Sequence, residues 1–242
     1  TIDQARQLLQ SADDFGFNTW SMDLMFSLPD QTEDELNRDL DELLEIGPPH
    51  VSIYGLSIEP NTPFHRAFHA GALELPEPTT WRRMYDNIVD RLQAAGLQRY
   101  EVSNFARVGH RAVHNEQVWR GGHYAGLGPG AHGFLPDGHR TLCHSDIDDW
   151  YADPTPTEQR PDHQDAAVDY LLSSLRHVDG SSRTALQEHY GFDLCQTNIN
   201  RLIEQRCIVE HGDHIQLTEI GFPIADGILR NLIESLERTH RT

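Results

Sequence analysis

The residues best suited to chemistry gather in one stretch, Tyr100–Leu135, which follows a strand-like run at 99–103. Six glycines lie between Gly121 and Gly133, and four of the chain's 15 histidines stand at positions 110, 114, 123 and 132. Neutral imidazole is a good ligand for metals, and glycine lets a backbone approach a ligand closely. The stretch is therefore the candidate ligand site of this chain.

The histidines and glycines of this region are also compatible with simpler roles. A divalent-metal site would draw on His110, His114, His123, His132, His139 and His144. No HxH pair, and no HxxxH pair on an expected helix, supports such a site, and acidic ligands nearby are few. The glycines at 126, 128, 130 and 133 indicate either close packing against something bulky or a tight series of turns.

Composition places the chain among acidic globular proteins. Its 242 residues, 38% of them hydrophobic, predict one large domain or up to two ordinary ones. The formal net charge is −19 and all 19 basic residues are Arg, so the surface repels nucleic acid and anionic lipid. No apolar run approaches the ~20 residues of a membrane span, and the polar N-terminus does not resemble a signal peptide. We expect no nucleic-acid partner and no membrane span.

The cysteines exclude two kinds of site. Cys143, Cys195 and Cys207 lie far apart, without CxxC or CxxxCxxC spacing. We therefore expect ordinary buried thiols, no disulfide framework and a cytoplasmic location. The chain by itself offers no ligand set for an iron–sulfur cluster.

The first hundred residues predict an α/β fold with a parallel pairing. A helix is expected at 2–15, a buried strand at 19–26, a helix from the Thr32–Glu35 capping box to about Ile46, and a strand at 50–58. Strand, helix and strand of these lengths form a βαβ unit. Asp23 lies inside the first strand, either bonded to a neighbouring loop or at the ligand-binding end of that strand.

The rest of the chain predicts further helices and a hairpin. After a long connection at 59–78 we expect a helix at 80–95, a strand at 98–103, a stretch without clear periodicity, a short helix after Ser145 and a Pro-rich boundary at 153–157. Beyond it, helices are expected at 165–175, 183–190 and 193–205, then a hairpin at 207–217 and a last helix to about Leu236. This order is winged-helix-like, but the acidic balance disfavours DNA binding.

Five ordered motifs carry a family resemblance: SMDLMFSLPDQT, VSIYGLSIEPNTPF, YEVSNFAR, HNEQVW and GLGPGAHG. Together they resemble the oxygen-independent coproporphyrinogen III oxidase-like radical S-adenosylmethionine family, and HNEQVW is closest to its HemW-type heme chaperones. The resemblance implies the back half of a partial (β/α)6 TIM-like barrel at 1–105, an extension and linker at 106–158, and a helical C-terminal domain at 159–242. It also implies a 4Fe-4S cluster that only the full-length protein would hold, so this chain alone should be inactive.

The resemblance also implies site residues. Asp23, Ser57, Ala131 and His132 match S-adenosylmethionine contacts, where a carboxylate can accept hydrogen bonds from ribose hydroxyls. His114, Asn115 and Trp119 match the heme signature HNxxYW, with His114 as the iron ligand and Trp119 able to stack on the porphyrin. Val118 replaces the Tyr of that signature. The alternative is that His114 and Asn115 only brace the loop.

Two functions follow from the resemblance. The first is a protein that binds heme and S-adenosylmethionine and delivers heme to an acceptor hemoprotein. The alternative is an oxygen-independent coproporphyrinogen III dehydrogenase of porphyrin biosynthesis. For a porphyrin ligand, we expect some of the four nearby arginines to face its propionates: Arg99, Arg107, Arg111 and Arg120. The sequence does not indicate the acceptor or an oligomeric state.

Overall fold

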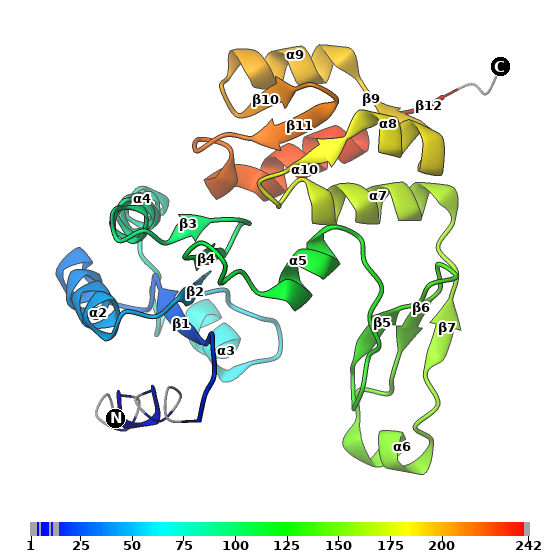
Figure 1. Ribbon diagram of the computed structural model, residues 1–242. Helices are drawn as coiled ribbons and strands as arrows, with labels where there is room; N and C mark the ends of the chain where they lie inside the picture. The colour runs from blue at the N-terminus through cyan, green and yellow to red at the C-terminus, as the bar shows by residue number, and fades with distance from the viewer. Residues whose placement is uncertain (1–3, 5, 10, 12–14, 240–242) are drawn as a thin grey trace. The chain divides into compact units, whose positions relative to one another are not determined.

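The computed structural model describes residues 4, 6–9, 11 and 15–239. The chain divides into two compact units, residues 1–112 (unit 1) and residues 113–242 (unit 2) (Figure 1). The expected domain boundaries after residues 105 and 158 stay predictions. Of the expected N-terminal helix, residues 4, 6–9 and 11 are helical, whereas Ile2, Ala5 and Ala12 lie outside the described residues.

Unit 1 is built on a four-stranded sheet of order β1-β2-β4-β3. β1 (Ser21–Phe26) pairs in parallel with β2 (His50–Gly55), which confirms the expected βαβ unit. β4 (Asn104–Ala106) lies antiparallel to β2 and to the two-residue strand β3 (Gln98–Arg99). The sheet is therefore mixed, with parallel pairing only at its β1 end.

The prediction of one strand at 98–103 is wrong, because the chain reverses within it. Tyr100 N donates to Asn104 O (3.1 Å), and Ser103 N donates to Glu101 Oε1 (3.1 Å). Glu101 thus fixes a tight hairpin between β3 and β4. The alternation of polar and apolar residues continues through this turn, so the pattern alone does not reveal it.

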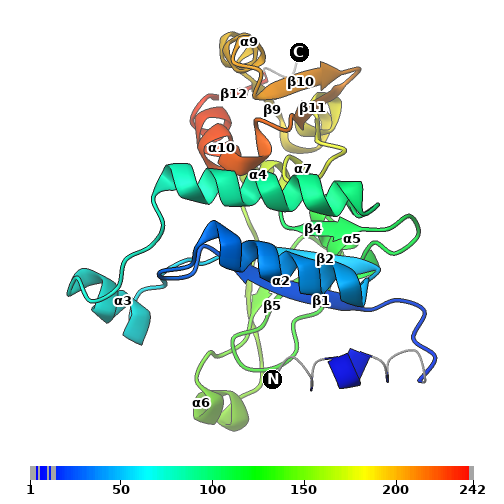
Figure 2. The same ribbon diagram turned by 90° about the vertical axis from the view of Figure 1, so that its left-hand side faces the viewer.

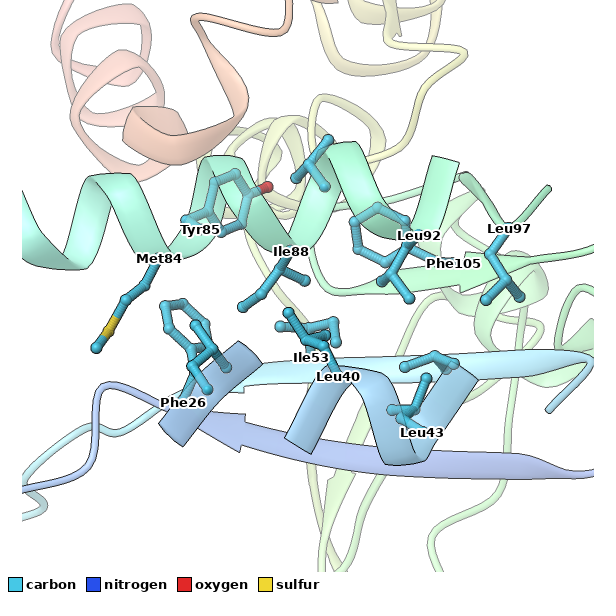
Figure 3. Packing of buried hydrophobic residues seen from close by; sticks show 13 residues of the cluster. Phe26, Leu40, Leu43, Ile53, Met84, Tyr85, Ile88, Leu92, Leu97 and Phe105 are labelled. Atoms are coloured by element: carbon cyan, nitrogen blue, oxygen red, sulfur yellow. The ribbon is translucent and has the colours of Figure 1, made fainter. Parts of the chain in front are cut away.

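Two helices cover one face of the sheet (Figure 2). α2 (Glu33–Ile46) begins at the expected capping box, where Thr32 Oγ1 accepts from Glu35 N (3.2 Å), and it ends at Gly47 with φ 73°. α4 (Pro78–Ala94) lies beside it. Their apolar stripes and the sheet form one buried cluster (Figure 3): Phe26, Leu36, Leu40, Leu43, Val51, Ile53, Met84, Tyr85, Ile88, Val89, Leu92, Leu97 and Phe105.

A short helix, α3 (Pro63–His69), lies within the expected long connection at 59–78. Thr62 caps it by accepting from His65 N (3.1 Å), and Pro63 occupies its first turn, where no hydrogen-bonded N–H is needed. None of its residues is buried. At seven residues the helix is shorter than the window in which a helical period can be recognised.

Unit 2 begins with α5 (Val113–Trp119) and an antiparallel meander. The meander strands are β5 (His132–Phe134), β6 (Arg140–Leu142) and β7 (Thr157–Gln159). α6 (Ile147–Ala152) is the expected short helix and is capped by Asp146. α5 lies in the histidine-rich stretch, which has no clear periodicity in the sequence, and it was not predicted.

The remainder of unit 2 follows the predicted order of helices and hairpin. Its helices are α7 (His163–Ser174), α8 (Arg183–Ala185) with the π-helix η1 (Leu186–Tyr190), α9 (Gln196–Glu204), the 3-10 turn η2 (Phe222–Ile224) and α10 (Ala225–Glu234). Its strands are β8 (Ser181–Ser182), β9 (Phe192–Leu194), β10 (Ile208–His211), β11 (His214–Leu217) and β12 (Leu236–Arg238). The β9–β12 pair was not predicted, and the winged-helix likeness stays a prediction. Among the described residues, none of the helices combines the length and apolar character of a membrane span.

Candidate functional site

Asp23 lies on the face of the unit 1 sheet opposite the helices. Phe26 of β1 packs into the core, whereas Ser21, Asp23 and Met25 are exposed. The expectation that Asp23 sits in a buried strand is therefore wrong, since only one face of β1 is covered. Its carboxylate needs no buried partner and is accessible to a ligand. Ser57 is also exposed and lies two residues beyond the end of β2.

A chain of hydrogen bonds crosses the same sheet. Ser21 Oγ lies 2.7 Å from His50 Nδ1, and His50 Nε2 lies 2.8 Å from the Tyr100 hydroxyl. His50 and Tyr100 are buried, and desolvation by burial lowers the pKa of His50. The imidazole is therefore held neutral, with both ring nitrogens engaged. Ser21, His50 and Tyr100 therefore satisfy one another and leave no free ring nitrogen on His50 for a ligand.

The predicted heme residues lie on α5 in unit 2 (Figure 1). His114 and Val118 are four positions apart and share one face of this helix, while Asn115 and Trp119 share the neighbouring face. His114 is exposed, and its ring meets that of Tyr124 edge-on with centroids 6.3 Å apart. Asn115, Val118 and Trp119 are half-buried. The helix thus presents an accessible imidazole beside an aliphatic and an aromatic side chain.

The glycines that follow α5 are required by the local backbone structure. A Cβ at Gly126 would lie 2.4 Å from His132 O, and a Cβ at Gly133 would lie 2.4 Å from Thr141 Oγ1. Gly128 and Gly130 have φ of 105° and 69°, which favours glycine. Tight turns and close backbone packing are therefore sufficient reasons for glycine at these positions. The S-adenosylmethionine contacts of Ala131 and His132 stay predictions.

A cleft of about 670 Å³ lies within unit 2, a volume typical of small-molecule sites, roughly 300–1,000 Å³. Four segments line it: 118–124 around the end of α5, 132–140 of the meander, 160–173 around the start of α7, and the end of η1 at 189–190. Val118, His132 and Gly133 are the residues of the predicted motifs that reach it. His114 does not line the cleft, but it contacts Tyr124, which does.

Aromatic rings form much of the cleft wall. Tyr190 stacks on Tyr170 with centroids 5.2 Å apart and an interplanar angle of 27°. Tyr170 is held by Ser182, whose N donates to its hydroxyl (2.8 Å). Burial raises the pKa of both tyrosines, so both phenols are neutral near pH 7. Tyr124 and Phe134 add further ring surface.

Charged groups of both signs line the cleft. Arg140 pairs with Asp169. Asp162 caps α7 by accepting from the backbone N–H of the second and third residues of that helix (2.8 Å each). Asp137 accepts from His139 N (3.2 Å), and this bond is the main cause of its lowered pKa. Arg160 is exposed and forms no ion pair or hydrogen bond with the described residues.

The four arginines expected near a porphyrin do not form one group within a unit. Arg99, Arg107 and Arg111 belong to unit 1, and Arg120 belongs to unit 2. Arg99 is buried and donates to the Tyr85 hydroxyl (3.0 Å). Arg120 pairs with Asp179 (3.0 Å). The arginines of the cleft, at positions 140 and 160, were missed, because nothing in their local sequence joins them to the histidine-rich stretch.

Only some of the cofactors considered fit the residues present. In the described part of the chain, no three His, Cys, Asp or Glu side chains gather to hold a metal ion. Cys143 and Cys207 are buried and Cys195 is half-buried, and all three are free thiols that lie outside the helices and strands. They do not fit a 4Fe-4S cluster. The exposed imidazole of His114, set beside Val118 and Tyr124, does fit an axial ligand of heme iron.

Two heme chaperones are similar in sequence to most of this chain. No protein-family model matches it. The heme chaperone HemW of Bacillus subtilis is 32% identical over 191 residues, covering 76% of this chain and 50% of the relative. The heme chaperone HemW of Escherichia coli is 31% identical over 225 residues, covering 90% and 58%. The chain therefore spans about half the length of the curated relatives that it matches.

Two further comparisons agree with these. The bovine mitochondrial radical S-adenosyl methionine domain-containing protein 1 is 44% identical over 119 residues, covering 49% of this chain and 27% of the relative. The solved structure of coproporphyrinogen III oxidase HemN from Escherichia coli, a radical SAM enzyme, superposes with a TM-score of 0.74 at 15% identity, covering 94% of this chain and 58% of that one. The likeness establishes a shared α/β fold. The ordered motifs, the HemW relatives and the HemN fold together show that this chain belongs to the HemN-like radical S-adenosylmethionine family, among its HemW-type members.

Proposed function

We propose that this chain carries the heme-binding part of a radical S-adenosylmethionine heme chaperone, which passes heme to an acceptor hemoprotein. The observation that supports this best is the face of α5, where the exposed imidazole of His114 stands beside Val118 and the ring of Tyr124. An accessible imidazole next to apolar surface suits axial ligation of heme iron. The relatives named heme chaperones point to the same ligand.

The residues of α5 take different parts in this proposal. His114 is the iron ligand. Val118 follows it on the same face and borders the porphyrin. Trp119 is half-buried on the neighbouring face with Asn115, so we assign these two side chains to positioning the helix rather than to stacking on the macrocycle.

S-adenosylmethionine remains part of the proposal for the whole protein. In unit 1, the exposed Asp23 carboxylate and Ser57 hydroxyl are proposed contacts, since both can accept hydrogen bonds from ribose hydroxyls. In unit 2, Ala131 and His132 are the proposed contacts. A 4Fe-4S cluster would supply the electron that cleaves S-adenosylmethionine in the family, but the cysteines of this chain do not fit one.

Heme titration followed by absorbance tests the ligand assignment. The 242-residue chain should shift the Soret band of added heme, and His114→Ala should lose this shift and bind heme about tenfold more weakly, or worse. His211→Ala is the matched control, because His211 is an exposed histidine of unit 2 outside α5 and the cleft. No Soret shift with the unaltered chain would overturn heme binding. An unchanged shift in His114→Ala would overturn the ligand assignment alone.

The coproporphyrinogen III dehydrogenase alternative is tested separately. The HemN likeness concerns the fold and carries no argument for that activity. An anaerobic assay of the full-length protein for protoporphyrinogen should show no turnover. Sustained formation of protoporphyrinogen would replace the chaperone proposal.

A further inference from the structure

We infer that the cleft of unit 2 binds the carboxylate-bearing edge of a planar macrocycle, and that Arg160 recognises the carboxylates. The inference rests on the proposed heme binding and deepens it, because it locates the acidic edge of the ligand and names a residue that sets specificity. None of the predicted heme residues, His114, Asn115 and Trp119, lines this cleft. The cleft therefore adds a binding surface to the one on α5.

The pairing of charges singles out Arg160. Each carboxylate that lines the cleft already has a partner: Asp169 has Arg140, Asp162 has the first turn of α7, and Asp137 has His139. Arg160 has none among the described residues and is exposed. Its planar guanidinium carries five N–H donors in a geometry that matches a carboxylate bidentately. Of the two arginines that line the cleft, Arg140 is paired with Asp169 and Arg160 is the one left to bind an acidic ligand.

The ring surfaces of the cleft determine the shape of ligand that fits. Tyr190 lies nearly parallel to Tyr170, and Ser182 fixes the Tyr170 ring by hydrogen bonds in both directions. Such a stack offers a flat, preordered face to a conjugated ring system. Tyr190 lies on the π-helix η1, a conformation that is often found at functional sites.

Val118 of α5 also indicates that the cleft accepts a planar ligand. The heme signature has Tyr at this position, and here Val118 is half-buried and lines the cleft. The smaller side chain leaves open the volume that a phenol ring would take. Val118→Tyr should therefore narrow the cleft and weaken binding of a planar ligand. Stronger porphyrin binding by Val118→Tyr would count against the cleft as the ligand site.

The test uses iron-free ligands, so that it does not depend on ligation by His114. Protoporphyrin IX and its dimethyl ester are titrated into the 242-residue chain and binding is followed by porphyrin fluorescence. The unaltered chain should prefer the diacid by about tenfold, the effect of losing one charge-assisted contact. Arg160→Gln should abolish this preference and leave affinity for the ester unchanged. Arg230→Gln, which alters an exposed arginine on α10 outside the cleft, should keep the preference.

The outcomes separate this inference from the proposed function. If heme binds with a Soret shift but Arg160→Gln retains the full preference for the diacid, the inference is wrong and heme binding stands. If the unaltered chain binds neither heme nor protoporphyrin, the proposed function is wrong as well. Loss of the preference in Arg230→Gln as well as in Arg160→Gln would mean that net charge alone sets it, which also overturns the role of Arg160.

Discussion

Unit 1 and the first part of unit 2, residues 113–160, are held together in opposite ways. Unit 1 packs two helices and one face of a sheet around a continuous apolar cluster of 13 residues. In residues 113–160 the buried residues are Gly133, Thr141 and Cys143, and none of these is a large apolar side chain. Unit 1 thus places its apolar residues in a core. Residues 113–160, which carry α5 and part of the cleft wall, leave their larger side chains at least partly accessible to a ligand.

We expect the largest loss of stability from a substitution in the core of unit 1. Leu40 is fully buried between α2, the sheet and α4, so Leu40→Ala should lower the free energy of unfolding by about 2–5 kcal/mol. Leu127→Ala is the control in the second region, because Leu127 is 89% exposed, and it should change stability by less than ~0.5 kcal/mol. Urea unfolding measures both. Equal losses in the two variants would contradict the contrast between the regions.

A second prediction concerns what holds the meander in place of a core. A Cβ at Gly133 would lie 2.4 Å from Thr141 Oγ1 and 2.9 Å from Gly126 N, so Gly133→Ala should cost about 1–3 kcal/mol by overpacking. Gly227→Ala on α10 meets no atom within 4 Å and should stabilise the protein by up to about 1 kcal/mol. Thermal unfolding measures the difference. A Gly133→Ala variant as stable as the unaltered chain would show that close backbone packing does not hold the meander.

We expect the smallest change in stability from the titration of one buried carboxyl group in unit 1. Glu101 is fully buried, and desolvation raises its pKa above the ordinary value of 4.5. The native state therefore keeps a proton that the unfolded state has lost, and this contribution to stability falls as pH rises from 4.5 through the folded pKa. Glu101→Gln has no proton to lose, so its stability relative to the unaltered chain should increase over that pH range.

Unfolding in urea at a series of pH values measures this difference. Glu204→Gln, an exposed position on α9, controls for the removal of one negative charge. A constant difference between Glu101→Gln and the unaltered chain from acid to neutral pH would contradict the role assigned to burial.

The same contrast accounts for which features the sequence could predict. α2 and α4 were predicted within two residues at each end, because their apolar residues recur at helical spacing and pack into a core. α3 and α5 were missed, and each is only seven residues long without a buried residue. Two turns of helix are too few to establish a helical period in a sequence.

The candidate site shows the same limit. His114 was found because HNEQVW is a continuous motif. The cleft was not found, because Arg160, Tyr170 and Tyr190 come from elements far apart in the chain from α5 and β5, and only the fold brings them to one wall. Local sequence contains no information about that arrangement.

We propose that heme binds the accessible groups of unit 2 and not the face of the unit 1 sheet that carries Asp23. Amide NMR with gallium protoporphyrin IX, a diamagnetic stand-in for heme, tests it most directly. We predict chemical-shift changes clustered at 113–124, 132–140, 160–173 and 189–190, with β1 and β2 unaffected. Changes confined to β1, β2 and the residues that follow them would show that the porphyrin binds unit 1 and not unit 2.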